Sequence, residues 1–485
     1  MKLPNRIEVF CSMHGHHILI GWILLLSILY STLSITRHNH FESGGFDLGL
    51  YDQSVWQYSR FIYPYNTVKE RFILGDHLTL TLPLLAPLLW FWDDVRMLLI
   101  FQVVWVMISA FAVYKLAKRR TLPSLPSLSL ACIYTLFYGI QYLIFFDFHP
   151  VAIGIGLLAW FCYFWEIRHH TLTILTCALL LLTQENMGIA LSGISLIYVF
   201  RKTFRTSAML FFITGILWSI IASKSIAFFS PVGFQYTPTV STNLLTIAKN
   251  FVDAPEKRQV LWYTLTSYTF IPLGSPGAIL AVLMDLGQYF ATGPGFSRMW
   301  SPFMHHRGTL AIFLTLGTID VLVYLKKKRI QVGAVALLLL ASSITQQYIF
   351  HFPLNKLAKK SFWQQEQWMT DNNTMISQIP REWSIATQQS LIPHLSHRKE
   401  MYLVWPRMHD IETEPCGRPR CWWLDFGGHP QYLLIDTHPY QWITQLLETN
   451  ENVLQALRNM EKDGVIRLEK KVGDIALYAV ISDNH

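Results

Sequence analysis

The sequence predicts an α-helical polytopic membrane protein with a C-terminal α+β domain. Three observations predict this fold class. Of the 485 residues, 52% are hydrophobic and only 14% are charged. Uncharged apolar runs long enough to cross a bilayer recur as far as residue 350. Residues 351–485 instead alternate apolar and polar side chains, which is typical of a soluble domain.

Clusters of Lys and Arg predict the topology, because these residues gather on the cytoplasmic side of a membrane. Lys2 and Arg6 place the N-terminus in the cytoplasm, and residues 17–35 form a first span that we expect to be retained as a signal anchor. A large external loop follows at 36–96. Within it, residues 78–92 are apolar but short and hold two prolines, so we expect an interfacial or re-entrant helix there.

The middle of the chain contains one apolar run that is too long for a single span. Spans are expected at 97–116, 127–146 and 151–165, and the run 171–200 then has basic residues at both ends. Both ends must therefore lie in the cytoplasm. We expect two short spans that turn at residues 183–186 and place Glu185 at the outer face, where an ionisable residue is costly and usually functional.

The last spans bring the predicted total to about eleven and leave the C-terminal domain outside the cytoplasm. They are expected at residues 208–229, 260–271, 278–290, 309–325 and 332–350, although the path of residues 230–290 stays open. We expect the protein in the inner (plasma) membrane, with the lipid bilayer around it. The net charge of +8 follows from the cytoplasmic basic clusters and does not indicate nucleic-acid binding.

The C-terminal domain, 351–485, contains strand-like pieces at 401–404, 432–435 and 475–481 and a helix-like piece at 440–462. Cys416 and Cys421 are the two cysteines that lie in a polar region. A disulfide between them would be stable outside the cytoplasm, and whether they are bonded stays open.

The predicted topology brings a set of ionisable residues to the external side: Asp47, Asp52, Asp76, His77, Asp147, His149, Glu185, His305 and His306. Asp47 and Asp52 lie five residues apart in the first polar stretch after the first span, so on one continuous helix their side chains point in different directions. We therefore expect different roles for them. Asp47 either caps a helix over 48–58 or acts as a catalytic carboxylate at the membrane face.

Residue types in this set suggest both metal binding and acid–base chemistry. The pairs Asp76-His77 and Asp147-x-His149 offer carboxylate and imidazole ligands for a possible divalent cation, although such a pair alone is more often structural. The sequence holds no glycine-rich phosphate loop, no nucleophile-elbow serine and no paired Cys-x-x-Cys zinc ligands. Because the cell exterior lacks nucleoside triphosphates, we expect a lipid-linked donor.

In glycosyl transfer from such a donor, a carboxylate can deprotonate the acceptor hydroxyl while a cation or an arginine stabilises the departing phosphate. Asp47 suits the first role. Four basic residues of the predicted external loops suit the second role equally well: Lys69, Arg71, Arg298 and Arg307.

Several motifs resemble a family of predicted prokaryotic membrane proteins that is known as a domain of unknown function. They are residues 45–53 (GFDLGLYDQ), Gly75-Asp76-His77, residues 146–150 (FDFHP), the pair His305-His306 and residues 391–398 (LIPHLSHR). The resemblance runs nearly end to end. Gln184-Glu185-Asn186 departs from the Lys-Glu-Asp that is usual in the family, which puts the activity of this member in question.

That family is similar to the GT-C glycosyltransferases, membrane enzymes that take sugars from polyprenyl phosphate. The resemblance implies a GT-C-like fold over residues 1–350, with Asp47 as the early catalytic carboxylate and Asp76 near a second acidic position. Together with the topology, it yields these candidate roles: catalytic Asp47 and Glu185; substrate-binding Asp52, Arg298, His305, His306 and Arg307; metal-binding Asp76, His77, Asp147 and His149.

Three functions remain open. The first is an inverting glycosyltransferase with a polyprenyl-phosphate donor and a glycan, lipid or protein acceptor. The second is a transporter of a small solute or ion, and the third is a scaffold without catalytic activity. A transporter would place its ionisable residues near the middle of the bilayer. The predicted cluster at one face therefore favours the enzyme.

Overall fold

The computed structural model describes residues 3–236, 240–406, 424–438 and 450–481. Cys416 and Cys421, and the start of the helix predicted at 440–462, lie outside these residues. The chain divides into two compact units. Unit 1 comprises Met1–Leu33, Leu74–Thr81 and Leu99–Lys359, and unit 2 comprises Ser34–Ile73, Leu82–Leu98 and Lys360–His485. Most of the predicted external loop 36–96 thus belongs to the same unit as the C-terminal residues. The sequence had predicted two domains divided at residue 350, with this loop in the first domain.

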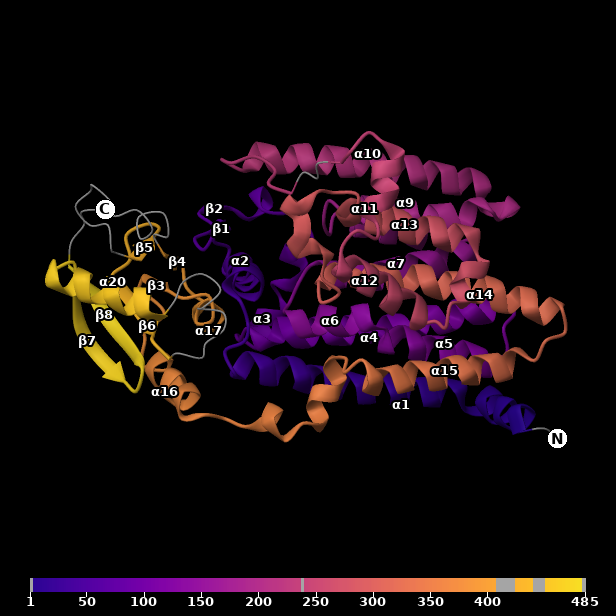
Figure 1. Cartoon of the computed structure of the whole chain (residues 1–485), viewed down its shortest axis with the longest axis horizontal. Helices are drawn as coiled ribbons and strands as arrows, with labels where there is room; N and C mark the ends of the chain where they lie inside the picture. The colour runs from indigo at the N-terminus through magenta and orange to yellow at the C-terminus, as the bar shows by residue number, and fades with distance from the viewer. Residues whose placement is uncertain (1–2, 237–239, 407–423, 439–449, 482–485) are drawn as a thin grey trace. The chain divides into compact units, whose positions relative to one another are not determined.

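Unit 1 is helical (Figure 1). Its main helices are α1 (Leu3–Asn39), α4 (Arg96–Arg119), α5 (Ser124–Leu136), α6 (Tyr138–Phe146), α7 (Val151–Glu166), α8 (His170–Leu181), α9 (Met187–Val199), α10 (Arg205–Phe229), α11 (Leu244–Asn250), α12 (Pro255–Thr266), α13 (Pro276–Phe290), α14 (Leu310–Lys327) and α15 (Val332–Ile349). Short 3-10 turns, among them η5 (Ile271–Gly274), η6 (Pro294–Trp300) and η7 (His305–Thr309), connect the later helices.

Several of these helices can span a membrane. In the part of the chain that the structure describes, six stretches are long and apolar enough: Arg6–Asn39, Arg96–Arg119, Ser124–Phe146, Lys202–Phe229, His305–Lys327 and Val332–Ile349. Four shorter apolar helices accompany them: Leu82–Phe91, Val151–Glu166, His170–Leu181 and Met187–Val199. The predicted count of about eleven spans stays a prediction, because length alone does not decide whether the shorter helices cross.

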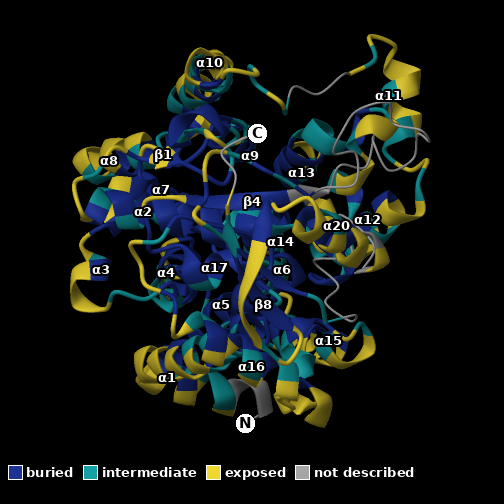
Figure 2. Ribbon diagram, turned by 90° about the vertical axis from the view of Figure 1, so that its left-hand side faces the viewer, coloured by how far each residue is buried: buried dark blue, intermediate teal, exposed yellow. Residues whose placement is uncertain are grey.

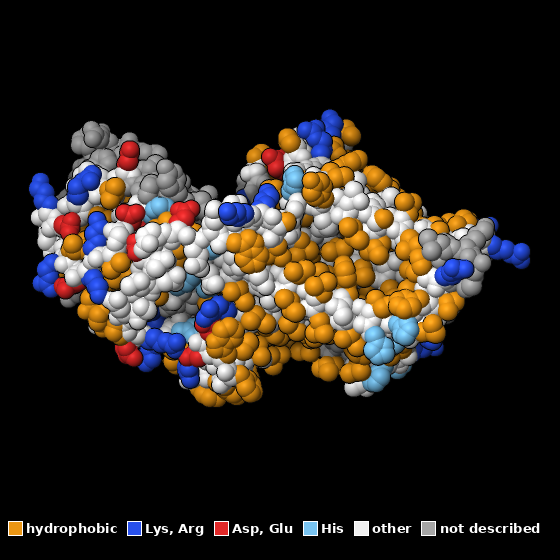
Figure 3. Space-filling model, turned by 90° about the horizontal axis from the view of Figure 1, so that it is seen from below, with side chains coloured by type: hydrophobic (Ala, Val, Ile, Leu, Met, Phe, Trp, Pro, Cys, Tyr) orange, Lys and Arg blue, Asp and Glu red, His pale blue; other side chains and the backbone are white. Residues whose placement is uncertain are grey.

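The outer helices of unit 1 carry the exposed apolar side chains that a lipid-facing surface needs. On α1, Leu24 and Ile28 are 59% and 65% exposed, and on α10, Leu210 is 63% exposed. Figure 2 colours much of α1 and α10 as exposed. In Figure 3, many hydrophobic side chains lie on the visible face of unit 1, between white atoms of the backbone and of other side chains. A contiguous apolar surface of this kind indicates a membrane or a partner rather than water.

The long apolar run 171–200 breaks where the sequence predicted. Helix α8 ends at Leu181 and α9 begins at Met187, so Glu185 lies in the break. Helix α9 packs closely on α10, because a Cβ atom on Gly188 would lie only 2.3 Å from the carbonyl oxygen of Gly215. Such small residues let two helix backbones approach in a membrane protein. The hydroxyl of Ser219 on α10 also donates a 2.8 Å hydrogen bond to the carbonyl oxygen of Glu185, which ties the break to the neighbouring helix.

Unit 2 contains a mixed six-stranded sheet with the strand order β5-β4-β3-β6-β8-β7. The strands are β3 (Ile385–Thr387), β4 (Met401–Pro406), β5 (Leu424–Phe426), β6 (Tyr432–Asp436), β7 (Ile466–Val472) and β8 (Ile475–Val480). Strand β3 runs parallel to β4 and β6, and the other pairs are antiparallel. The three strands that the sequence predicted are β4, β6 and β8.

Helices cover both faces of this sheet, because successive strand residues point to opposite sides. Ala386 packs in a core with α20 (Asn450–Lys462), whereas its neighbour Ile385 packs in a second core with α16 (Gln367–Ile376) and α17 (Ile392–Leu395). Unit 2 also holds the turn η1 (Gly45–Gly49), helix α2 (Leu50–Ser59), the hairpin β1 (Tyr65–Asn66) and β2 (Arg71–Phe72), and two short turns, η3 (Leu82–Leu85) and α3 (Leu88–Phe91), within the predicted interfacial segment.

Candidate functional site

The predicted site residues gather in two clusters, one in each unit. The first is the Glu185 cluster of unit 1, which we define as Asp76, His77, His149, Glu185 and His305. Glu185 is 7% exposed, and its Oε1 lies 2.7 Å from Nδ1 of His77. Its Oε2 accepts a hydrogen bond of 3.4 Å from the backbone amide of Leu78. The side-chain amide nitrogen of Gln184, which can only donate, also lies 3.3 Å from Nδ1 of His77, so the tautomer of the imidazole decides whether Nδ1 donates to Glu185 or accepts from Gln184.

The ring of His77 is held from two further sides. The ring of Tyr236 stacks on it at 4.7 Å with an interplanar angle of 12°. The ring of His149 meets it edge-on at 6.0 Å. The hydroxyl of Tyr236 lies 3.4 Å from Oδ1 of Asp76, so the buried carboxylate belongs to the same cluster.

Residues from η7 complete the cluster. The ring of His305 stacks on that of His149 at 3.7 Å, and His306 follows with its ring stacked on Tyr289 at 4.0 Å. Four segments that are far apart in the sequence are thus joined: 76–77, 147–149, 184–186 and 305–306. Among the described residues, two buried polar atoms near this point make no hydrogen bond: Gln184 Oε1 and His305 Nδ1. Buried polar atoms of this kind are normally satisfied by water or a ligand.

Three other predicted residues lie in unit 1 in different surroundings. Asp147 is buried directly after α6, and its carbonyl oxygen accepts a 3.0 Å hydrogen bond from the side chain of Gln102. Arg307 is fully buried, donates to the carbonyl oxygens of Met299 and Ser301, and lies over the ring of Tyr289. Arg298 is exposed on η6. The described contacts of Arg307 are thus those of a residue that holds the loop 299–307 in place.

No group of three or more His, Cys, Asp or Glu residues among those described is arranged to hold a metal ion. The possible metal site at Asp76, His77, Asp147 and His149 therefore stays a prediction.

The second cluster is the His397 clamp of unit 2, which we define as Asp52, Asp93, Ser396 and His397. Nε2 of His397 lies 2.9 Å from Oδ2 of Asp52, and Nδ1 lies 2.9 Å from Oδ1 of Asp93. The hydroxyl of Ser396 also donates a short hydrogen bond to Oδ2 of Asp52. Asp52 is completely buried and His397 is 8% exposed. One imidazole thus joins α2, the segment before α4 and the residues after α17.

Charge explains how this imidazole tolerates burial. Burial lowers the pKa of His397, but the neighbouring carboxylates of Asp52 and Asp93 outweigh this effect and raise the pKa to about 9. His397 is therefore a cation at neutral pH. The hydrogen bond with His397, together with the contact of Arg381, holds the pKa of Asp93 well below its usual range. Arg60 pairs with the same carboxylate at 2.9 Å.

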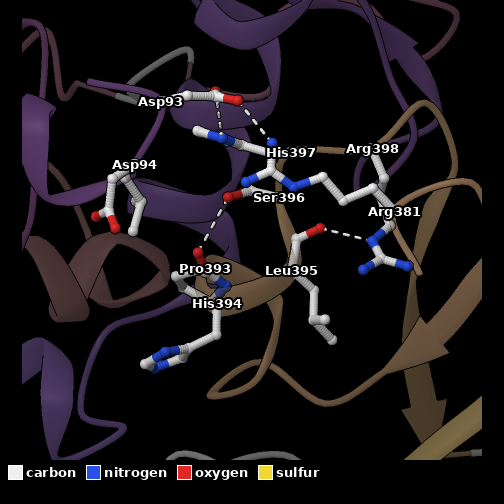
Figure 4. A pocket seen from close by; sticks show the side chains of 10 residues that line it. Asp93, Asp94, Arg381, Pro393, His394, Leu395, Ser396, His397 and Arg398 are labelled. Carbon is white, nitrogen blue, oxygen red and sulfur yellow. Dashed lines mark hydrogen bonds and ion pairs between the residues drawn. The ribbon is translucent and has the colours of Figure 1, made fainter. Parts of the chain in front are cut away.

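A pocket of about 110 Å³ lies beside the clamp (Figure 4). It is lined by Asp93, Asp94, Val95, Arg381 and residues 393–398. Asp52 was predicted to bind substrate. It does not line this pocket, and its carboxylate is buried against Ser396 and His397.

Asp47 lies on η1, a five-residue π-helical turn that leads directly into α2, and its side chain is half-buried. The helical turn begins at Gly45, and the N-cap positions of η1 and α2 are Gly44 and Gly49, so Asp47 is the N-cap residue of neither. The alternative in which Asp47 caps a helix over 48–58 is therefore wrong. Lys69, a predicted phosphate-binding candidate, lies with Nζ 5.5 Å from the ring centre of the adjacent Phe46.

Asp93, Tyr236 and His397 carry only weak signals in the sequence. Asp93 precedes a predicted span in an Asp-Asp pair, and Tyr236 lies in a loop rich in Pro and Thr. Neither position shows a motif. His397 belongs to the stretch 391–398, which the sequence resemblance marked, but its partners Asp52 and Asp93 are known only from the structure.

No curated protein sequence matches the chain. The solved structure of ArnT from Cupriavidus metallidurans bound to undecaprenyl phosphate is similar over 96% of this chain and 98% of that chain, with 10% sequence identity and a TM-score of 0.49. A likeness at this level carries no argument about what this chain binds or does. The profile of the family described as predicted membrane protein (DUF2079) matches residues 37–466, which is most of the chain. The protein therefore belongs to this family of predicted membrane proteins.

Proposed function

We propose that this protein is an inverting glycosyltransferase of the GT-C type. It transfers a sugar from a polyprenyl-phosphate donor to a cell-surface acceptor, at the extracytoplasmic side of the inner membrane. The observation that carries the proposal is the Glu185 cluster. Two carboxylates and three imidazoles from four separate segments gather at the break between two apolar helices. Groups that exchange protons are expensive to bury in such surroundings and usually serve a function there.

The pairing of His77 with Glu185 is suited to stabilising a leaving phosphate. A carboxylate that accepts from one imidazole nitrogen fixes the ring and favours its protonated form. An imidazolium next to a departing phosphate can donate a hydrogen bond to the developing negative charge. In this proposal His77 acts on the polyprenyl phosphate, and Glu185 orients His77.

The acceptor requires a general base, and we assign this role to Asp47 from its sequence motif alone. Asp47 belongs to unit 2 and the Glu185 cluster to unit 1, and the two assignments are made and tested independently. The acceptor hydroxyl attacks the anomeric carbon, its proton passes to the carboxylate of Asp47, and the bond between that carbon and the phosphate oxygen breaks. Polyprenyl phosphate leaves, and the anomeric configuration is inverted. The motif at residues 45–53 supports this assignment through its resemblance to the first external loop of GT-C enzymes.

A divalent cation at Asp76, His77, Asp147 and His149 is the alternative to the His77 imidazolium, because a histidine binds a metal only in its neutral form. Carboxylate and imidazole side chains are suitable ligands for several divalent metals. Metal analysis of the purified protein before and after dialysis against a chelator checks this point. A stoichiometric metal that is lost from a His149→Ala variant supports the site, and a metal-free wild type contradicts it.

The test of the function compares wild type, Asp47→Asn, Glu185→Gln and a deletion strain at matched expression. Mass spectrometry measures cell-surface glycans and extracted polyprenyl-phosphate sugars. We expect both variants to lose a sugar from an acceptor while the lipid-linked donor accumulates. Glu461→Gln, an exposed position on α20, is the control and should behave as wild type.

Identical profiles in all strains, including the deletion strain, would refute the glycosyltransferase. A specific observation then favours transport, because Glu185 is buried between two apolar helices, as ionisable residues of transporters are.

A further inference from the structure

The turn that carries Asp47 packs directly against residues from the C-terminal part of unit 2. Helix α17 lies on η1, with Ile392 at the contact. Ile392 is completely buried. A Cβ atom on Gly49 would lie 2.4 Å from Cγ2 of Ile392, and one on Gly45 would lie 2.8 Å from Cδ1. Gly45 and Gly49 therefore leave the space on η1 that the side chain of Ile392 occupies.

Space rather than backbone conformation explains the glycine at position 49. Its φ of −63° and ψ of −41° are ordinary right-handed helical values that any residue adopts. In a helix, a glycine without a conformational reason costs stability relative to alanine. The close approach of Ile392 supplies the reason here.

Polar contacts extend the same junction on both sides of Ile392. Before it, the side chain of Gln389 accepts a 3.2 Å hydrogen bond from the backbone amide of Phe46, the residue next to Asp47. After it, Ser396 and His397 hold Asp52, which lies on α2 directly beyond η1. The segment 389–397 thus contacts the turn itself and the first residues of the helix that follows it.

The geometry of η1 explains why such support is needed. A π-helical turn is rare and is less favourable than an α-helical one, so it persists where the surroundings hold it. A general base must also stay within hydrogen-bond reach of the proton that it removes. A misplacement of about 1 Å can lower a rate by about 100-fold.

We propose that the segment 389–397 is a positioning element for Asp47. Ile392 packs on Gly45 and Gly49, Gln389 holds Phe46 near the start of the turn, and His397 holds Asp52 on the helix that follows the turn. This inference rests on the proposed role of Asp47 as the base. Ile392 is thus a positioning residue, since it acts on the reaction only through η1.

The experiment uses paired size changes in the full-length protein. Gly49→Ala adds a methyl group where Ile392 lies, and Ile392→Ala removes the atom that this methyl group would meet. The double variant combines both changes and restores the space. Ile392→Val keeps Cγ2 and is the conservative variant. Leu457→Ala is the control for general damage, because Leu457 is equally well buried on α20 in the other core of the sheet.

Two quantities are measured on each variant: hydrogen exchange of the backbone amides of residues 44–52 in purified protein, and the transferred sugar in cells by mass spectrometry. Gly49→Ala and Ile392→Ala should exchange at least about tenfold faster in this peptide. Their product should fall by about 10- to 100-fold. The double variant and Ile392→Val should recover a large part of the amide protection and of the sugar transfer. Leu457→Ala should leave the exchange of this peptide unchanged.

The possible failures can be told apart. Unchanged exchange in both single variants overturns the proposed support of η1. Faster exchange in these variants with an unchanged amount of transferred sugar overturns the positioning role of the segment 389–397. The proposed glycosyltransferase function is then not affected. If Asp47→Asn keeps full product formation, the base assignment fails and the positioning role fails with it. The exchange data then still report whether α17 supports the turn.

Discussion

Nδ1 of His77 and Oε1 of Glu185 lie 2.7 Å apart, although 108 residues separate them in the chain. His77 follows the predicted external loop residue Asp76, and Glu185 lies between α8 and α9. The contact couples an imidazole to a carboxylate in surroundings where an unpaired charge would be costly.

The first prediction concerns this pair. Glu185→Gln keeps the size of the side chain but removes the carboxylate that, in the proposal, orients the imidazole of His77. Because positioned proton-transfer groups contribute about 100-fold or more to a rate, transfer of the sugar should fall by about 100-fold. The accumulated polyprenyl-phosphate sugar measures this effect. Thr183→Ser, a mild change in the same break, is the control. Full activity of Glu185→Gln would exclude the pair from the chemistry.

The second prediction concerns pH and the His397 clamp. The folded protein raises the pKa of His397 from 6.5 to about 9, so the protonated form stabilises the fold. This stabilisation is fully present below pH 6.5 and is lost as the pH rises through about 9. The difference corresponds to about 3 kcal/mol.

Hydrogen exchange of residues 389–404 between pH 6 and 10, corrected for the intrinsic effect of pH on exchange, checks the second prediction. Protection should fall with rising pH in wild type and should change much less in His397→Gln. Parallel pH profiles for the two proteins would contradict a role for this imidazole.

The third prediction concerns a buried ionic network of unit 1. Oε1 of Glu166 is shared by Arg120, Arg201 and the hydroxyl of Tyr198, and Arg120 also pairs with Asp320 at 2.6 Å. Breaking a buried ion pair leaves the remaining charge uncompensated, which costs about 3–5 kcal/mol. Glu166→Gln should therefore lower the free energy of unfolding by about this amount.

Thermal unfolding in detergent measures the change. Glu256→Gln, an exposed position in the first turn of α12, should leave the unfolding temperature almost unchanged. An equally small effect of Glu166→Gln would mean that water already solvates these arginines.

The fourth prediction concerns the contact between α9 and α10. Gly188→Ala places a methyl group 2.3 Å from the carbonyl oxygen of Gly215, so the two helices must separate. Overpacking of this kind costs about 1–3 kcal/mol. Gly21→Ala is a matched control, because a Cβ atom there meets no atom within 4 Å, and alanine favours the helix by about 0.5–1 kcal/mol. The unfolding temperature should fall for the first variant and rise slightly for the second. Equal shifts would contradict the close approach.

Much of the fold could be predicted because hydropathy and charge act locally. The break at residues 183–186 followed from basic residues at both ends of one apolar run, and the structure has it between α8 and α9. Strands β4, β6 and β8 were predicted because they are apolar and rich in β-formers. Strand β7 was missed, since five of its seven residues are exposed and it shows no apolar alternation.

The division into units was harder to predict. The segments 34–73 and 82–98 lie between membrane helices in the sequence, yet they form one compact unit with the residues after 359. Their apolar residues pack there on a sheet whose strands begin only at Ile385, as the contact of Phe41 with the core around α16 and α17 illustrates. The apolar pattern of a segment predicts that it is buried, but it does not predict which distant part of the chain it packs against.

The sequence by itself determined where most of the long apolar helices of unit 1 lie and where the run 171–200 breaks, because a segment in a membrane must satisfy its backbone hydrogen bonds within itself and its composition reveals this. It did not predict the break at Phe137 between α5 and α6. It also determined which residue types are available for chemistry. Only the tertiary structure decided that Glu185 pairs with His77, that His397 pairs with Asp52 and Asp93, and that Ile392 fills the space above Gly49. These contacts join residues that are far apart along the chain, so packing, and no local pattern, sets the distances between them.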